Sequence, residues 1–251
     1  MSGAGRRHSS DDLTLARELG QRAERPVVFT GAGVSAESGI PTFRDALTGL
    51  WAQYDPEQLA TEAGYRADPA LVWRWYASRR ERIAQAKPNP GHDVIADYAR
   101  RKPRLQLITQ NVDGLHQRAG SVDVIELHGN ILRVRCLNGC AGPAAGWESD
   151  PRVPPLCARC SAPLRPDVVW FGEFLPEAAL ARAQRAVAEC DLMIVVGTSA
   201  LVYPAAELPF SARRNGSEVI TVNPEPTAVD EIASVTLAGK AGDLLPRLLG
   251  G

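Results

Sequence analysis

Five short apolar runs, spread along most of the chain, restrict the fold more than any other feature. They are Pro26–Phe29, Leu105–Thr109, Val122–Glu126, Leu192–Val196 and Glu218–Val222. Each has the length of a strand, and several are apolar almost throughout, which is typical of parallel strands covered on both faces. Segments with helical spacing lie between some of them, at Leu13–Glu24, Ala178–Glu189 and Gly242–Leu249. This alternation predicts an α/β fold, a Rossmann-like parallel sheet with helices on both faces.

Four of the five cysteines form two close pairs, and these predict a metal site. The pairs are Cys136-x-x-x-Cys140 and Cys157-x-x-Cys160. Zinc takes four thiolates in a tetrahedron, and short spacings let one turn present two sulfurs to one ion. The surrounding segment is turn-rich and could not build a core alone, so a structural zinc would supply its folding energy. Two unrelated Cys pairs are the alternative, and Cys190 is expected to be a packed thiol.

Two insertions into the sheet pattern predict a second, smaller domain. Residues 47–86 are rich in Trp, Tyr and Arg and have helical character, and residues 132–165 carry the cysteines. We expect these two to form the small domain, a helical insertion with a zinc-binding module. The large nucleotide-binding domain would comprise residues 1–46, 87–131 and 166–251. A crevice between the two is the expected active site.

Polar turns follow four of the apolar runs. Gly31-Ala-Gly33 follows the first and could let backbone N–H groups approach a pyrophosphate, although Gly-x-Gly alone is a weak signal. Asn111 and Asp113 follow the second, where ligands of open α/β sheets bind. Gly197-Thr-Ser199 and Glu225 follow the fourth and fifth. No good second strand precedes an acid at the distance a dehydrogenase requires, so hydride transfer is disfavoured.

His128 follows the third run, in Glu126-Leu-His-Gly-Asn130. Histidine is the side chain whose ordinary pKa suits acid–base work near neutrality. A single histidine after a strand is more often structural, but this one lies between a nucleotide-type strand end and the cysteine module. His8, His92 and His116 have no comparable setting, so His128 is the candidate base.

These motifs together resemble the sirtuins, NAD-dependent protein-lysine deacylases. The matching pieces occur in the family's order over about residues 20 to 245: Gly31–Arg44, Thr109–Asp113, His128-Gly129, the two Cys pairs, Gly197–Ser199 and Asn223-x-Glu225. One departure is the Cys136–Cys140 spacing, which is one residue longer than usual and still compatible with zinc.

The resemblance implies how NAD is used. Ile40 to Arg44 would form a flap over the nicotinamide ribose, Asp113 would hold the nicotinamide carboxamide, and Asn111 the ribose and an ordered water. His128 would be the general base that activates a ribose hydroxyl. Nicotinamide, free lysine and an O-acyl-ADP-ribose would be the products. The implied NAD contacts are Gly31, Ala32, Gly33, Ser35, Ala36, Thr42, Phe43, Arg44, Gln110, Asn111, Asp113, Gly197, Thr198, Ser199, Asn223, Glu225 and Ala241.

Tyr76 and Arg79 suggest the acyl group. They are three residues apart and so share one helix face, where a phenol and a guanidinium could hold a carboxylate. For an arbitrary helix, a solvated Arg face with one packed Tyr would be the better interpretation. Within the family, the pair and Ala60 resemble the class III members, which remove succinyl, malonyl or glutaryl groups. The resemblance therefore implies a desuccinylase that retains weaker deacetylase activity.

The expected partners are acyl-lysine proteins, bound as an extended strand between the edges 168–173 and 199–203. The net charge of −1 gives no general attraction to nucleic acid, and no apolar run approaches the ~20 residues of a membrane span. A monomer in the bacterial cytoplasm is expected. The alternatives are a sirtuin acting mainly as a deacetylase or ADP-ribosyltransferase, a zinc-containing NAD-dependent dehydrogenase, or a zinc-ribbon binding module.

Overall fold

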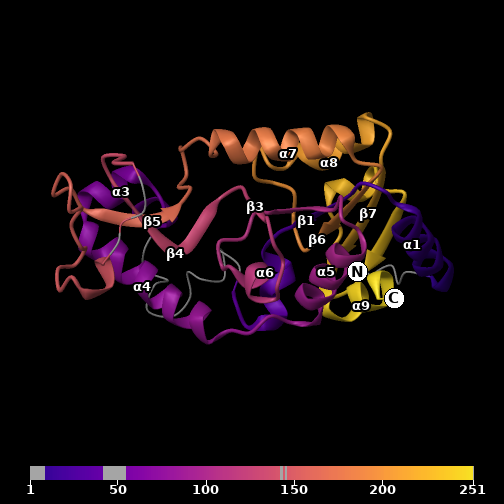
Figure 1. Ribbon diagram of the computed structural model, residues 1–251, viewed down its shortest axis with the longest axis horizontal. Coiled ribbons are helices and arrows are strands. Elements are labelled where there is room, and N and C mark those ends of the chain that lie inside the picture. The colour runs from indigo at the N-terminus through magenta and orange to yellow at the C-terminus, as the bar shows by residue number, and fades with distance from the viewer. Residues whose placement is uncertain (1–8, 42–54, 142–143, 145, 251) are drawn as a thin grey trace, which may run out of the picture.

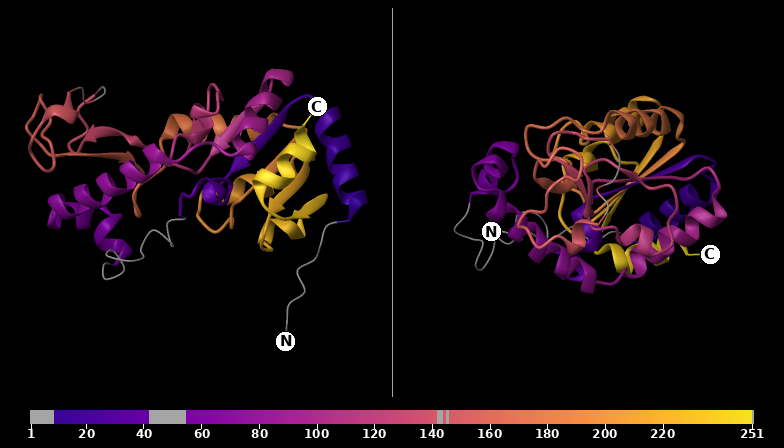
Figure 2. Two further views of the ribbon diagram at one scale, coloured as in Figure 1. Left: turned by 90° about the horizontal axis from the view of Figure 1, so that it is seen from below. Right: turned by 60° about the vertical axis from the view of Figure 1, so that its left-hand side comes forward.

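The chain folds into a large part built on one sheet and a smaller part at one end of it. A computed structural model describes residues 9–41, 55–141, 144 and 146–250. In Figure 1 the sheet lies between helices above and below it, and the small part projects to the left. The left-hand view of Figure 2 shows the same division, with the small part at one end and the yellow C-terminal elements at the other.

The main sheet has six strands, all parallel, in the order β3-β2-β1-β6-β7-β8. β2 and β3 follow β1 in turn on one side of it. The next strand of this sheet, β6, pairs with β1 on its other side. The order therefore reverses between β1 and β6, which is where ligands of open α/β sheets bind. The strands are β1 (Pro26–Thr30), β2 (Gln106–Thr109), β3 (Ile125–Glu126), β6 (Leu192–Val196), β7 (Glu218–Asn223) and β8 (Val235–Ala238).

Helices cover both faces of this sheet, so the predicted α/β fold class is confirmed. One face packs on α1 (Ser10–Arg22), α5 (Pro90–Arg101) and α9 (Ala241–Leu249), and the other on α7 (Glu177–Glu189) and α8 (Glu207–Arg214). β1 and β6 are buried along their whole length, which explains their uninterrupted apolar sequence. Burying each such Val or Leu contributes about 1.5–3 kcal/mol.

The sequence predictions for individual elements were right in the centre of the sheet and incomplete at its edges. Leu192–Val196 matches β6 residue for residue. The run predicted over Val122–Glu126 is a strand only at Ile125–Glu126, because Asp123 has a φ of 55° and belongs to a turn. β8, α5 and α8 were not predicted.

The small part joins three helices to an antiparallel hairpin. The helices are α2 (Pro56–Leu59), α3 (Glu62–Ala67) and α4 (Pro69–Gln85), and the hairpin strands are β4 (Gly129–Cys136) and β5 (Leu164–Val168). Trp75, Tyr76 and Tyr65 pack with Ile131 and Trp170 into one buried cluster. The helical character predicted for the insertion is confirmed over residues 55–86, while the exact domain boundaries stay a prediction.

The shorter elements are η1 (Ala32–Ser38), α6 (Leu115–Arg118), η4 (Trp147–Ser149) and η5 (Ala228–Glu231). Among the described residues, every helix is too short or too polar to cross a bilayer.

Candidate active site

The carboxyl ends of β1, β2 and β6 lie next to one another at one edge of the sheet. The backbone N–H of Gly31 donates to the carbonyl of Val196 (2.9 Å), and that of Gln110 donates to the carbonyl of Thr30 (2.9 Å). The hydroxyl of Thr30 donates to that of Thr109 at 2.8 Å. The predicted site segments that follow β1, β2 and β6 are therefore brought together by the sheet itself.

The glycines after β1 allow the loop to lie against the turn after β6. A Cβ on Gly31 would come within 2.7 Å of the Thr198 Cβ, and a Cβ on Gly33 within 2.7 Å of the Gly197 Cα. The N–H groups of Gly31 and Gly33 are bonded to the carbonyls of Val196 and Gly197. Close packing thus explains these two glycines without a ligand, and their contact with a pyrophosphate stays a prediction.

Ser35, Asn111 and Asp113 form a buried polar group beneath the loop. The amide of Asn111 donates to the Ser35 hydroxyl at 3.1 Å, and that hydroxyl donates to Asp113 Oδ2 at 2.8 Å. The other oxygen of Asp113 accepts the backbone N–H of Leu115 at 2.8 Å. Burial raises the pKa of Asp113, while the bonds from Leu115 and Ser35 lower it. The structure thus brings three of the predicted NAD-binding side chains into direct contact.

His92 adjoins this group, although no sequence pattern pointed to it. Its Nδ1 lies 3.3 Å from the backbone N–H of Asn89, which can only donate, so the neutral ring carries its proton on Nε2. That Nε2 lies 3.3 Å from the Ser35 hydroxyl and so donates to it. Burial lowers the pKa of His92 to about 4, which keeps the ring neutral at physiological pH. His92 therefore fixes the direction of the Ser35 hydroxyl toward Asp113.

His116 is buried against the ring of His92, with ring centres 4.9 Å apart. Its Nε2 lies 2.9 Å from the Thr30 hydroxyl. Burial, aided by the neighbouring His92, lowers its pKa to about 3. His92 and His116 are both buried and hydrogen-bonded, and both contact residues of the site, which the sequence motifs did not predict.

His128 has the geometry of a general base. Its Nδ1 lies 2.9 Å from the carbonyl of Gln110, and a carbonyl can only accept, so Nδ1 carries the proton. The neutral ring then presents the lone pair of Nε2. Burial lowers the pKa of His128, and the bond to Gln110 opposes that shift in part. The ring is thus held in the one tautomer that leaves Nε2 able to take a proton.

The other predicted cofactor residues lie around the same strand ends, except Thr42, Phe43 and Arg44. The Gln110 amide donates to the Thr198 hydroxyl at 2.8 Å, and the Asn223 amide donates to the Glu225 carbonyl at 2.8 Å. Ala241 begins α9. Ala32, Ala36, Ser199 and Glu225 are exposed. The predictions for Thr42, Phe43 and Arg44 lie outside the described residues, and so does most of the predicted flap.

The four paired cysteines converge at the tip of the hairpin. Their sulfurs all lie within 4.8 Å of one another, and those of Cys136 and Cys160 are 3.5 Å apart. A tetrahedral site with Zn–S bonds of about 2.3 Å needs sulfurs about 3.8 Å apart, so the set fits one zinc ion. Four thiolates leave no open position, and the site is structural. Cys190 lies elsewhere, buried with its sulfur 3.2 Å from the Ser217 hydroxyl, as predicted for a packed thiol.

The sequence profile of the Sir2 family matches residues 31–204 of this chain. The chain belongs to the Sir2 family. An NAD-dependent protein deacylase of Ralstonia nicotianae is 57% identical over 234 residues, which are 93% of this chain and 94% of that protein. A crystal structure of a Sir2 homolog–NAD complex has a TM-score of 0.86 at 46% identity, covering 97% of this chain and 94% of that one. A Sir2–p53 peptide–NAD⁺ structure has a TM-score of 0.80 at 35% identity, covering 92% and 94%.

The predicted acyl-binding pair of this Sir2 chain lies on α4, in the core of the small part. Tyr76 is 3% exposed, and the guanidinium carbon of Arg79 lies 4.8 Å from the Trp75 ring centre and 5.9 Å from that of Tyr76. Burial raises the pKa of Tyr76 and lowers that of Arg79, and each opposes the other's shift by its charge. The two side chains thus lie together in a partly desolvated place, which excludes a fully solvated Arg face.

The tautomer and burial of His128 predict the pH dependence of this Sir2 chain. Its folded pKa is lowered from 6.5, so the ring stays neutral and able to accept a proton to below pH 6.5. The acid limb of activity that needs neutral His128 should therefore be centred below pH 6.5. The acid limb of kcat/KM measures this. An acid limb centred above pH 7 would contradict the assignment.

Proposed function

We infer that this chain is an NAD-dependent protein-lysine deacylase, and we propose that it removes succinyl and malonyl groups and, more weakly, acetyl groups. Family membership supports the reaction class, since the relative from Ralstonia nicotianae carries the name NAD-dependent protein deacylase. The single observation that supports the acyl preference is the placement of Tyr76 and Arg79 side by side on α4.

The roles of the residues are those that the resemblance to the sirtuins implies, and the hydrogen bonds of these residues are compatible with them. Bound NAD would supply an activated ribose: nicotinamide would leave from it, the acyl group would pass from lysine to the ribose, and one water would be consumed to give free lysine and O-acyl-ADP-ribose. Asp113, aligned by Ser35, holds the nicotinamide carboxamide, and Asn111 holds the ribose and a water. Nε2 of His128 takes the proton of a ribose hydroxyl, because its Nδ1 is already bonded to Gln110.

A carboxylate-ended acyl chain suits the chemistry of the Tyr76 and Arg79 side chains. A guanidinium forms charge-assisted hydrogen bonds to a carboxylate, and such bonds are about twice as strong as neutral ones. The phenol of Tyr76 adds a neutral donor, because its raised pKa keeps it protonated. Ala60 lies in the same buried cluster as Tyr76, and a side chain this small would leave more room for a chain longer than acetyl than a larger residue would.

The substrate main chain would lie as a strand against residues 168–173 and 199–203. These two segments carry large exposed apolar side chains, Phe171, Leu201, Val202 and Tyr203 among them, which suits a peptide-binding edge. The Sir2–p53 peptide–NAD⁺ complex is a precedent in the family for a bound peptide. The proposal also includes that the chain is a monomer and is located in the bacterial cytoplasm.

A paired assay tests the function first. The purified chain and NAD are mixed with one peptide that carries either acetyl-lysine or succinyl-lysine, and peptide mass and nicotinamide release are followed. We expect faster succinyl removal. Acetyl removal alone would keep the deacylase and reject the carboxylate preference. Transfer of label from NAD into protein would favour the ADP-ribosyltransferase alternative, and a change in reduced-cofactor absorbance the dehydrogenase.

Replacing Arg79 by methionine should lower kcat/KM for desuccinylation by about 100-fold or more, since a buried carboxylate would lose its cationic partner. Deacetylation, which involves no carboxylate, should fall much less. Arg74→Met is the matched control, because Arg74 lies on the same helix and is exposed. Equal losses on both peptides in Arg79→Met, or equal effects of the two variants, would refute the proposed selectivity.

A further inference from the structure

A hydrogen bond within the small part determines which way the Tyr76 hydroxyl can act. The indole Nε1 of Trp170 lies 3.0 Å from the Tyr76 oxygen, and both groups are buried. An indole N–H only donates, so the Tyr76 oxygen is the acceptor in this bond. The hydrogen of the Tyr76 hydroxyl must therefore be directed elsewhere. No group in the described part of the chain accepts it.

Trp170 is held in place on three sides. Its backbone N–H donates to Glu173 Oε2 at 2.9 Å, and the guanidinium carbon of Arg165 lies 3.3 Å from its ring centre. Tyr65 packs on the ring with centres 5.2 Å apart. Trp170 is 2% exposed, so the indole has little freedom to turn away from Tyr76.

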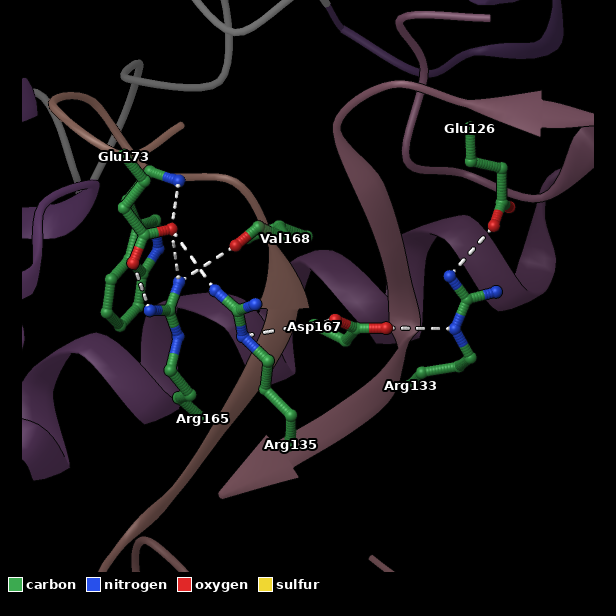
Figure 3. A network of polar contacts seen from close by, with 8 residues as sticks. Glu126, Arg133, Arg135, Arg165, Asp167, Val168 and Glu173 are labelled. Carbon is green, nitrogen blue, oxygen red and sulfur yellow. Dashed lines mark hydrogen bonds and ion pairs between the residues drawn. The ribbon is translucent and has the colours of Figure 1, made fainter. Parts of the chain in front are cut away.

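Arg165 and Glu173 belong to a network of ion pairs that anchors this segment to the hairpin (Figure 3). Arg165 pairs with Glu173 and donates to the carbonyl of Val168 at 2.8 Å, and Arg135 pairs with Glu173 at 3.2 Å. Arg165 is 3% exposed, and both of its terminal nitrogens are bonded, whereas its Nε has no hydrogen-bond partner in the described part of the chain. The network thus fixes the segment that carries Trp170.

We propose that Trp170 is a positioning residue for acyl selectivity, because its indole N–H occupies the accepting side of Tyr76 and leaves the Tyr76 O–H to donate to the carboxylate of the acyl chain. The inference rests on the proposed desuccinylase function and deepens it. A carboxylate only accepts hydrogen bonds, so a hydroxyl fixed as a donor suits it. Without Trp170 the hydroxyl would be free to turn, and part of its contribution would be lost.

The test is the ratio of kcat/KM values for succinyl and acetyl peptides. In Trp170→Phe we expect this ratio to fall about fivefold to tenfold, the size of one neutral hydrogen bond. Acetyl turnover serves as the internal measure of whatever the substitution does to the segment 168–173. In a Tyr76→Phe background the same substitution should change the ratio less than twofold, since no hydroxyl remains to be directed.

An equal fall of the ratio in both backgrounds would overturn the inference, because Trp170 would then act through pocket shape. A wild-type chain that prefers acetyl would instead refute the proposed function. Should Trp170→Phe fail to fold, 3-benzothienylalanine at position 170 replaces the indole N–H by sulfur at nearly unchanged volume. The same fall in the ratio is expected there, and an unchanged ratio would overturn the inference.

Discussion

Replacement of His128 by alanine should lower kcat/KM for deacylation by about 10²- to 10⁴-fold, the usual contribution of a positioned general base. His128 is the only described histidine whose ring is held with Nδ1 on a carbonyl at a strand end and a lowered pKa that leaves Nε2 free to accept. The measurement is the initial rate of deacylated peptide formation at saturating NAD.

Exchange of labelled nicotinamide into NAD separates this role from a structural one. The exchange reports on nicotinamide release and return, which precede proton removal from the ribose in the proposed sequence. It should fall much less than deacylation in His128→Ala, with unchanged thermal unfolding. Equal loss of both activities would place His128 in cofactor binding and remove it from the base role.

Loss of the zinc site should have a comparably large effect. Cys157→Ser should lower bound zinc from about one ion per chain to nearly none, and it should abolish deacylation. The buried cluster around the cysteines is small, so the metal must supply much of the folding energy of this module, on the order of 10 kcal/mol. Metal analysis, thermal unfolding and the peptide assay measure the three consequences.

Cys190→Ser is the matched control for the zinc prediction. Cys190 is a buried thiol outside the cluster of four cysteines, and its sulfur is hydrogen-bonded to the Ser217 hydroxyl. Its replacement should leave the zinc content unchanged. Zinc retained in Cys157→Ser, or absent from the wild-type chain, would contradict the assignment of a single structural ion to the four cysteines.

The centre of the sheet was predictable because burial on both faces leaves a strong local signal. β1 and β6 are apolar at every position but Thr30, and a short apolar run of this length is typical of a strand buried on both faces. β8 reads Val-Thr-Leu-Ala, four residues that alternate weakly, and its place depends on pairing with β7. Such short edge strands are defined by pairing with a neighbouring strand, so local patterns alone do not reveal them.

The sequence motifs predicted candidate residues of the site, but they did not predict the contacts between these residues. Asn111, Asp113 and His128 stand directly after strands, and that position was the signal that found them. His92 lies near the start of α5, a helix that was not predicted, and it reaches Ser35 across 57 residues of sequence. Likewise nothing local connects Trp170 with Tyr76. These pairings arise from tertiary packing alone.

The small part is joined through one buried cluster that mixes residues 59–83 with residues 131–170. The aromatic side chains of residues 59–83 cannot be fully buried before residues 131–170 are present. On the ribosome, α4 must therefore wait until synthesis has passed Trp170, some 94 positions after its partner Tyr76. This delay exposes Trp75 and Tyr65 meanwhile, the kind of surface that chaperones bind. A fragment ending before residue 170 should thus aggregate even though it contains α4 entire.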